Sequence, residues 1–137
     1  MTAPTTLRMA EVSAAEALRL LESTGQGRLV HFRRESAVVR PAVHVLQYGH
    51  LIARTPTQEA ALADRVAPTY QANEIKGPGG TGWTTTMTGP AEVVTDTDEA
   101  AHYRRTLPGW TYGPHDTLVR IRPQAVNGFR LLSPETM

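Results

Sequence analysis

Short β-prone runs, separated by turn residues, recur along this 137-residue chain and limit the folds that are open to it. We assign strands to six segments: residues 28–33, 37–46, 51–55, 81–94, 117–122 and 128–132. Residues 81–94 form either one long strand or a bent pair of strands. The turn residues Tyr48 and Gly49 predict that residues 37–55 fold back as a hairpin. Pro41 cannot donate a ladder hydrogen bond, so it predicts an edge or a bulge there. About six or seven short strands predict a closed antiparallel barrel of the mainly β class.

Capping patterns predict two or three helices beside these strands. Ser13 stands three residues before Glu16, and Asp96 stands three residues before Glu99. At this spacing the cap side chain and the carboxylate satisfy the first backbone N–H groups of a helix. A third helix is expected over residues 58–65. The predicted class is therefore α+β with a dominant barrel and flanking helices.

Composition narrows the classes of function. At 15.0 kDa the chain is sized for one domain, residues 1–137, and its net charge of +1 favours neither nucleic acid nor an anionic membrane as a partner. The absence of cysteine excludes disulfides and thiolate chemistry. No stretch approaches the roughly 18 apolar residues of a membrane span, and the N-terminal residues do not read as a secretion signal. We therefore expect a cytoplasmic protein that acts on a small molecule.

The segment from Arg54 to Thr57 is the first candidate binding site. It places an arginine and two threonines between an apolar run and the start of the predicted helix over residues 58–65. A guanidinium, hydroxyl groups and a helix N-terminus together suit a phosphate group. We expect that phosphate to belong to FMN.

Other side chains have two interpretations each. His44 is either a partly exposed strand histidine or a group that faces a cavity, since it lies opposite the face of Val43 and Val45. Trp83 and Trp110 are either core residues or flat walls for a ring system. Arg120, which shares its strand face with Arg122, is either solvated or an anion contact. The five histidines show no ligand spacing, so no metal site is expected.

Four segments carry a family resemblance. Residues 110–123 read WTYGPHDTLVRIRP and are followed by VNGFRL, residues 81–84 read TGWT, residues 41–44 read PAVH, and Arg54 is followed by Thr55. Together they resemble the pyridoxamine 5′-phosphate oxidase-like family of FMN-binding split barrels, in its short actinobacterial type. The first is similar to the family's closing pattern, the second to its Thr-Gly-Trp-Ser element, the third to a strand that lies beside the flavin, and the fourth to its Arg-Thr pair. The similarity covers most of the chain.

The resemblance implies a six-stranded antiparallel split β-barrel that forms a homodimer with two clefts at the subunit interface. It also implies an FMN-dependent oxidoreductase that passes a hydride between a nicotinamide donor and a small organic acceptor. By this resemblance Arg54, Thr55, Thr57 and Gln58 hold the phosphate, and Val43 and His44 run along the isoalloxazine. The remaining walls are assigned to Trp83, Thr84, Trp110 and Arg120.

Two departures from the family pattern leave alternatives open. Glu59 stands where relatives carry a basic residue, and Lys76 or a second subunit would have to replace that charge. His44 stands where relatives often carry Tyr or Phe, which puts a proton-exchanging group beside the cleft. The first alternative is a flavin-free enzyme that uses His44 as acid or base in a cyclisation or isomerisation. The second is a non-catalytic module that binds a flavin, and a deazaflavin in place of FMN is also left open.

Overall fold

The computed structural model describes residues 6–62, 67–76, 79–109 and 115–133. Two α-helices, α1 (Ala14–Glu22) and α2 (Thr97–Thr106), and one 3₁₀-helix, η1 (Glu59–Leu62), accompany nine strands within these residues. The strands are β1 (Arg8–Glu11), β2 (Gln26–Arg33), β3 (Ser36–Gln47), β4 (His50–Thr55), β5 (Thr69–Lys76), β6 (Thr81–Thr88), β7 (Ala91–Val93), β8 (Thr117–Ile121) and β9 (Ala125–Leu132).

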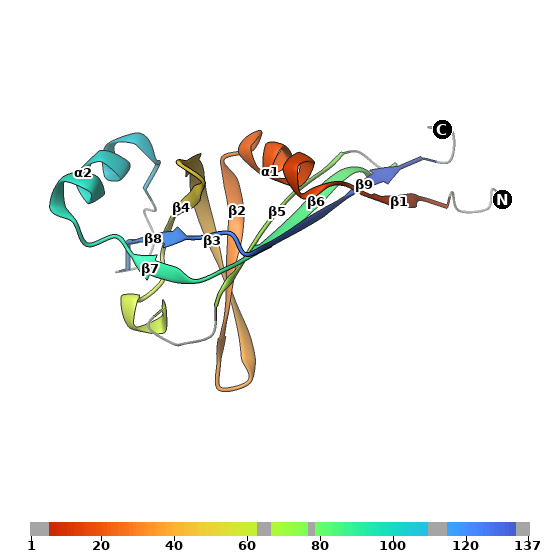
Figure 1. Cartoon of the computed structure of the whole chain (residues 1–137). Helices are drawn as coiled ribbons and strands as arrows, with labels where there is room; N and C mark the ends of the chain where they lie inside the picture. The colour runs from red at the N-terminus through yellow and green to blue at the C-terminus, as the bar shows by residue number, and fades with distance from the viewer. Residues whose placement is uncertain (1–5, 63–66, 77–78, 110–114, 134–137) are drawn as a thin grey trace.

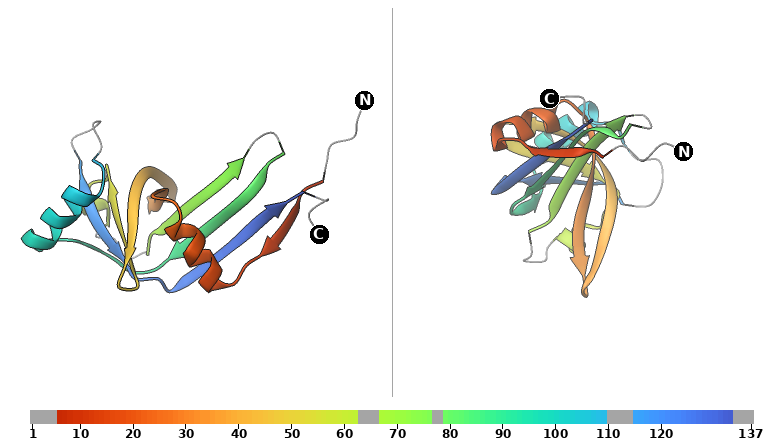
Figure 2. Two further views of the ribbon diagram at one scale, coloured as in Figure 1. Left: turned by 90° about the horizontal axis from the view of Figure 1, so that it is seen from above. Right: turned by 90° about the vertical axis from the view of Figure 1, so that its right-hand side faces the viewer.

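All nine strands form one antiparallel sheet in the order β1-β9-β6-β5-β2-β3-β4-β8-β7. The sheet curves, so that its β4-β8-β7 end and its β6-β9-β1 end face in different directions (Figures 1 and 2). Helix α1 packs against β6 and β9, while α2 lies at the opposite end of the sheet (Figure 1). The predicted mainly β class with flanking helices is confirmed.

The predicted count of six strands is wrong, because the described residues hold nine. Strand β1 has only four residues, largely exposed, so its sequence carries little apolar signal. Strand β5 alternates polar and apolar residues too loosely to be assigned from sequence. Residues 81–94 form the second of their two predicted arrangements, a pair of strands that is divided at Gly89 and Pro90. A side chain at Gly89 would overlap the carbonyl of Arg122, which crosses at this point.

The N-cap at the head of each predicted capping box is confirmed, while the paired carboxylate bonds an arginine instead. The third helix differs from its prediction. The Ser13 hydroxyl accepts a hydrogen bond from the backbone N–H of Glu16, and Asp96 accepts one from the N–H of Glu99. In place of an α-helix over residues 58–65, the structure has the single 3₁₀ turn η1. The last part of that predicted helix lies outside the described residues.

The hairpin predicted over residues 37–55 is confirmed as β3 and β4. Tyr48 and Gly49 form its two-residue turn with φ angles of 53° and 76°, the left-handed values that such turns require. Pro41 pairs with Arg28 of β2, whereas pairing with β4 begins at Val43. Pro41 therefore has a strand neighbour on one side only, which confirms the predicted edge position.

Two apolar clusters pack on opposite faces of β3. Ala42 belongs to the cluster that contains Leu21 of α1 and Tyr70 of β5. Val43 points to the other face and packs with Tyr103 of α2. Because side chains alternate along a strand, α1 contributes to the cluster on one face and α2 to the cluster on the other.

The β2–β3 hairpin extends beyond its neighbours. Pairing of β2 with β5 ends at Val30, and β4 pairs with β3 only from Val43 onward. The tip of the hairpin therefore projects from the sheet, near η1 (Figure 1). Arg34 and Glu35 form its turn at φ angles of 52° and 69°, which are uncommon for residues other than glycine.

Candidate functional site

A cavity of 640 Å³ opens between the projecting β2–β3 hairpin and η1. This volume falls in the range of roughly 300–1,000 Å³ that is typical of small-molecule sites. Its lining residues come from the hairpin, from η1 and the segment before it, and from the segment just before β8: His31, Phe32, Arg33, Arg34, Val38, Arg40, Pro56, Thr57, Gln58, Ala60, Ala61 and His115. We call this space the hairpin cavity.

Strand alternation puts the key side chains of the hairpin cavity on one face of the hairpin. Leu29 and His31 are two residues apart on β2, so they share a face. His31 lies opposite Val38, and Leu29 lies opposite Arg40, in the register of β2 and β3. Leu29 is fully buried in the core. The same face thus runs from the core outward into the cavity.

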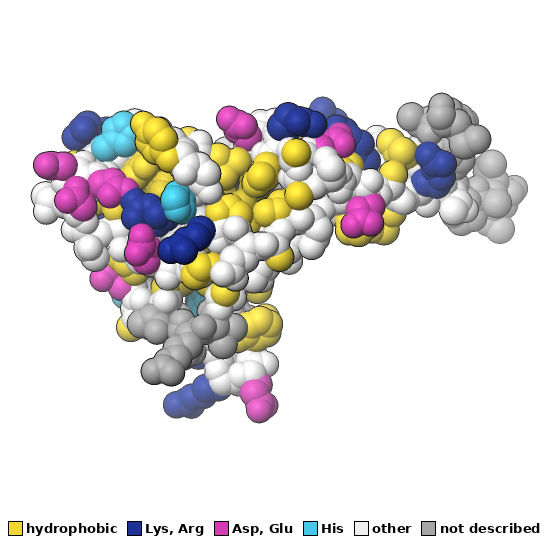
Figure 3. Space-filling view, in the orientation of Figure 1, with side chains coloured by type: hydrophobic (Ala, Val, Ile, Leu, Met, Phe, Trp, Pro, Cys, Tyr) yellow, Lys and Arg dark blue, Asp and Glu magenta, His cyan; other side chains and the backbone are white. Residues whose placement is uncertain are grey.

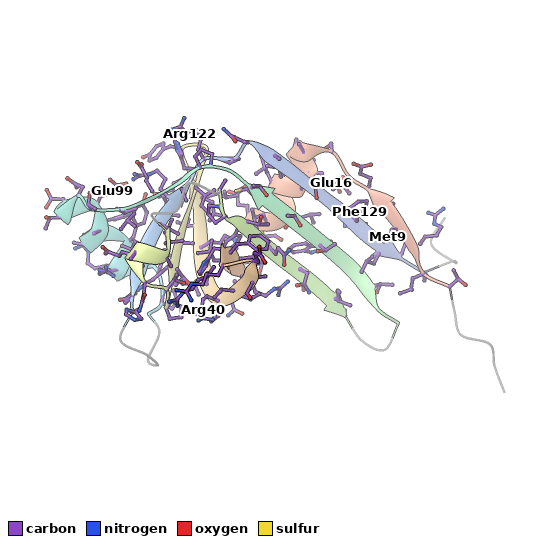
Figure 4. All side chains as sticks on the ribbon, turned by 90° about the horizontal axis from the view of Figure 1, so that it is seen from below. Met9, Glu16, Arg40, Glu99, Arg122 and Phe129 are labelled. Atoms are coloured by element: carbon purple, nitrogen blue, oxygen red, sulfur yellow. The ribbon has the colours of Figure 1, made fainter. Side chains whose placement is uncertain are left out.

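The described lining of the hairpin cavity is basic. Arg33, Arg34 and Arg40 line it, and its described lining residues include no carboxylate. Within the described part of the chain, none of these arginines pairs with Asp or Glu. Arg40 lies near η1 in Figure 4, and Figure 3 shows one basic and one acidic side chain at the hairpin tip. A basic lining of this kind attracts an anion, and guanidinium groups suit the oxygens of a phosphate.

His31 is buried in the wall of the hairpin cavity, and no described residue is its hydrogen-bond partner. Its exposed fraction is 7%, and both Nδ1 and Nε2 lack a partner, which is true of no other buried side-chain atom among the described residues. Burial, together with the positive charge of Arg40, lowers the pKa of His31. Buried polar atoms are nearly always bonded, so these two nitrogens mark a place where a ligand can supply the missing partners.

Two of the predicted phosphate ligands, Thr57 and Gln58, lie at the hairpin cavity. The Thr57 hydroxyl is 3.0 Å from the Thr55 hydroxyl, and the Thr57 carbonyl accepts a hydrogen bond from the Thr117 hydroxyl. Gln58 Nε2 lies 3.1 Å from Nε2 of His115. These bonds join the segment before η1 to β8 and to the residues just before it, and so hold this rim of the cavity in place.

Arg54 and Thr55, the other two predicted phosphate ligands, line neither this cavity nor the second one described below. Arg54 grips Asp116 with two bonds, Nε to Oδ1 at 2.8 Å and Nη2 to Oδ2 at 2.7 Å. Its Nη1 donates to the carbonyls of Arg104 and Leu107 at the end of α2. The Thr55 hydroxyl donates to the carbonyl of Pro41. The hydrogen bonds of these two side chains therefore link β4 to the end of α2, to the segment before β8 and to β3.

The bidentate pair also sets the charge state of Asp116. The hydrogen bonds from Arg54 hold the pKa of the Asp116 carboxyl below its usual range, and Arg104 adds a second positive charge nearby. The same bonds raise the pKa of Arg54. Asp116 therefore stays ionised between two arginines and links β4, α2 and β8.

Val43 and His44 line a second cavity, of 440 Å³, which the start of β2, the second half of β3 and the end of α2 enclose. His44 is buried, so the interpretation as a partly exposed strand histidine is wrong. Its Nε2 lies 2.8 Å from the carbonyl of Leu21, to which only an N–H can donate. Its Nδ1 then accepts the Tyr70 hydroxyl at 2.5 Å, and burial lowers the pKa of His44. Both ring nitrogens are engaged within the protein.

The remaining predicted wall residues are dispersed. Trp83 is part of the core cluster around Tyr70, which is its structural interpretation, and Thr84 lies next to it on β6. Arg120 pairs with Glu92 and Glu99, so its guanidinium faces carboxylates. Trp110 lies outside the described residues. The structure thus places the predicted ligands in several separate environments of one chain.

Sequence reasoning missed the hairpin cavity residues His31, Arg33, Arg34 and Arg40. Their signal was present in the two strands around the Arg34-Glu35 turn, where a two-residue connection fixes which side chains lie opposite each other. Writing out that register would have placed Arg40, His31 and Arg33 on one face. The strands predicted over residues 28–33 and 37–46 left three residues between them, so neither the two-residue turn nor its register was predicted from the sequence.

Two absences hold for the described residues. They contain no group of three or more His, Cys, Asp or Glu side chains that could hold a metal ion. None of their helices is long and apolar enough to cross a membrane.

The sequence profile of the pyridoxamine 5′-phosphate oxidase family matches residues 13–130, a span that includes both helices and the hairpin cavity. The chain belongs to this family. The resemblance seen in the sequence is thereby confirmed.

Relatives of this pyridoxamine 5′-phosphate oxidase family member match along most of their length. The uncharacterized protein Rv0080 of Mycobacterium tuberculosis is 35% identical over 130 residues, which cover 90% of this chain and 86% of that protein. A candidate pyridoxamine 5′-phosphate oxidase from Corynebacterium glutamicum has a solved structure with a TM-score of 0.73 and 25% identity, covering 91% of this chain and 99% of that one. A FAD-binding protein from Mesorhizobium loti shares the fold, with a TM-score of 0.73, 19% identity, and coverage of 92% and 98%.

Proposed function

We propose that this family member binds FMN with its phosphate in the hairpin cavity and acts as an FMN-dependent oxidoreductase. It would transfer a hydride between a nicotinamide and a small organic molecule. The observation that carries the proposal is the basic wall formed by Arg33, Arg34 and Arg40, with no carboxylate among the described lining residues. Relatives of the same fold that bind FAD make a flavin the first ligand class to test.

The described residues fit the phosphate end of FMN. Arg40 and Arg33 share the hairpin face with His31, whose two unbonded nitrogens can each meet a phosphate or ribityl oxygen. Thr57 and Gln58 bring polar groups to the same cavity. In this proposal Arg33, Arg34 and Arg40 take the role that the sequence analysis gave to Arg54, because the Arg54 guanidinium already holds Asp116.

Apolar residues of the same cavity fit the ring end of the ligand. Phe32, Val38 and Pro56 line it, and Phe32 is 53% exposed, which leaves an aromatic face available for stacking. When bound, the flavin would supply the redox-active ring that exchanges the hydride. The chain's own residues would hold the phosphate, orient the ring and keep water from one side of it.

We further propose a homodimer that completes the cleft. The other face of the hairpin carries four apolar side chains that are wholly or partly exposed: Val30, Phe32, Ala37 and Val39. An apolar strand face of this kind is typical of an interface. Since Phe32 also lines the hairpin cavity, a second copy seated on this face would cover the open side of the cavity.

The geometry gives little support to the alternative of a flavin-free enzyme with His44 as acid or base. One ring nitrogen donates to the Leu21 carbonyl and the other accepts the Tyr70 hydroxyl. Proton exchange with a substrate would first require one of these buried bonds to break.

The visible absorption spectrum of the purified protein, followed by addition of NADPH or NADH without oxygen, tests the proposal. We expect the bands of bound oxidised flavin, and we expect them to bleach when the nicotinamide is added. A protein that takes up no FMN in equilibrium dialysis would refute the proposed cofactor. Tight FMN uptake without bleaching by either nicotinamide would instead support a non-catalytic flavin-binding module.

A further inference from the structure

We propose that His31 makes anion uptake by the hairpin cavity dependent on a proton: the ring is neutral in the empty cavity and binds a tetrahedral oxyanion as an imidazolium. This inference rests on the proposed function only in naming the phosphate of FMN as the natural anion. Its physical basis is the cavity itself, and sulfate can probe it without any flavin.

The geometry singles out His31 among the histidines of the chain. Its ring is buried at 7% exposure and lines the cavity, and neither of its nitrogens has a partner among the residues that the structure describes. His44, the other buried histidine, has both nitrogens bonded. His115 also lines the cavity, but its Nε2 meets Gln58. His31 is therefore the described histidine that is best able to take both a proton and a ligand.

The groups around His31 favour a neutral ring until an anion arrives. Arg33 on β2, Arg34 in the turn and Arg40 on β3 are the charged side chains that line the cavity with it, and His115 stands before β8. From β5, Tyr70 shares the face of Leu29, but its hydroxyl is bonded to His44. Glu35 of the turn and Glu59 of η1 are exposed and do not line the cavity.

An oxyanion in the cavity reverses this balance. A negative charge within hydrogen-bond reach raises the pKa of a histidine by about 1–3 units, and its oxygens accept from the ring N–H groups. In the empty cavity, burial and Arg40 lower the pKa of His31. At a pH between the two values, each anion that binds takes up one proton. Affinity therefore falls as the pH rises, by up to tenfold per pH unit.

Sulfate is the suitable probe, because it does not titrate near neutral pH, whereas a phosphate monoester titrates with a pKa of about 6. Calorimetry of sulfate binding to the full-length protein, in two buffers of different ionisation enthalpy, measures proton uptake directly. Measured in steps from about pH 5 to pH 8, around the ordinary histidine pKa, proton uptake should rise to a maximum that approaches one proton per sulfate at a pH between the two pKa values of His31. Imidazole ¹⁵N shifts should show His31 changing from neutral to charged as sulfate is added.

His31→Gln keeps a polar side chain that cannot be charged, and it should remove both the proton uptake and the pH dependence of sulfate affinity. The matched control is His50→Gln, because His50 lies at the β3–β4 turn, away from the cavity. The ¹⁵N measurement on the unmodified protein remains decisive if His31→Gln fails to fold. Sulfate binding without proton uptake, a His31 ring that stays neutral with sulfate bound, or no sulfate binding at any pH would each overturn the proposal.

The sulfate measurements also separate this inference from the proposed function. Proton-linked sulfate binding without FMN uptake would sustain the role of His31 and reject the flavin. FMN uptake together with pH-independent sulfate binding would sustain the flavin and reject the role of His31.

Discussion

His44 is held by two internal hydrogen bonds that tie together three elements. Its ring joins the carbonyl of Leu21 at the end of α1 to the hydroxyl of Tyr70 on β5. The Tyr70 ring reaches this position because Gly27 lacks a side chain, and a Cβ there would lie 2.5 Å from the Tyr70 ring. A residue that reads as a candidate acid or base in the sequence thus serves the packing of the core.

Replacing His44 with Phe tests this structural role. The Tyr70 hydroxyl and the Leu21 carbonyl would each lose a buried partner, so we expect a loss of about 1–3 kcal/mol in the free energy of unfolding, measured by urea denaturation. Adding Tyr70→Phe to His44→Phe should cost less than the sum of the single changes, because the orphaned hydroxyl disappears. Flavin reduction should persist in His44→Phe. Loss of turnover in a stably folded His44→Phe protein would instead favour an acid or base role.

Mild acid should destabilise the protein, because His31 and His44 are buried as neutral rings. Burial lowers the pKa of both, so below about pH 6.5 the unfolded chain binds more protons than the folded chain. As the pH decreases below this value, the free energy of unfolding should therefore decrease by up to about 1.4 kcal/mol per pH unit for each ring. The pKa of Asp116 is also lowered, but its contribution is lost only below the ordinary carboxyl range near pH 4.

Urea unfolding between about pH 5 and pH 8, in buffer free of sulfate and phosphate, measures this dependence across the ordinary histidine pKa. His44→Phe should reduce the pH dependence of the free energy of unfolding by the contribution of one histidine. A free energy of unfolding that stays constant over this range would show that the two rings are not held neutral in the folded protein.

At the scale of elements, we expect substitution of Arg54 to lower the stability of the fold and substitution of Arg40 in the hairpin to leave it nearly unchanged. Arg54→Lys cannot reproduce the two-point grip on Asp116, so it should lower the free energy of unfolding by about 2–3 kcal/mol. Among the described residues, the Arg40 side chain bonds only the carbonyl of Val39, so Arg40→Lys should barely alter stability. Urea denaturation of both variants, with FMN titration of each, gives the comparison. If Arg54→Lys weakened FMN binding at unchanged stability, Arg54 would be the phosphate ligand that the sequence analysis predicted.

The elements that could be predicted from sequence are those with local causes. The caps at Ser13 and Asp96, and the turn at Tyr48 and Gly49, depend on residues within four positions of each other. The role of Arg54 depends on Asp116, which lies 62 residues away in the chain. No local pattern marks such a pair, and the arginine therefore read as a free ligand.

The same limit applies to the candidate site. Thr57 and Gln58 were predicted and do line the hairpin cavity, because they follow directly from the end of β4. The basic wall of the cavity forms only through the register in which β2 pairs with β3. The opposite wall forms because residues 59–62 are a 3₁₀ turn and not part of a longer helix. The family resemblance predicted the fold class, but it could not say which arginines face the cavity.

At the scale of the whole molecule, the proposed homodimer would bury the apolar face of the hairpin. Val39 is 49% exposed and does not line the hairpin cavity. Val39→Asp should therefore produce monomers, because a buried unpaired carboxylate opposes association. Sedimentation equilibrium measures the mass, with Tyr48→Asp as the control at an exposed turn. A wild-type protein that sediments as a monomer at micromolar concentration would contradict the proposed interface.

The central claim is that the hairpin cavity holds the phosphate of a flavin, and the comparison of FMN with riboflavin tests it most directly. Riboflavin lacks the phosphate, so calorimetry should give FMN the tighter binding by about ten- to a hundredfold, the value of one charge-assisted bond. Arg40→Gln should weaken FMN by a similar factor and leave riboflavin unchanged. Equal affinities for the two flavins, or an Arg40→Gln protein that binds FMN as the wild type does, would contradict the account.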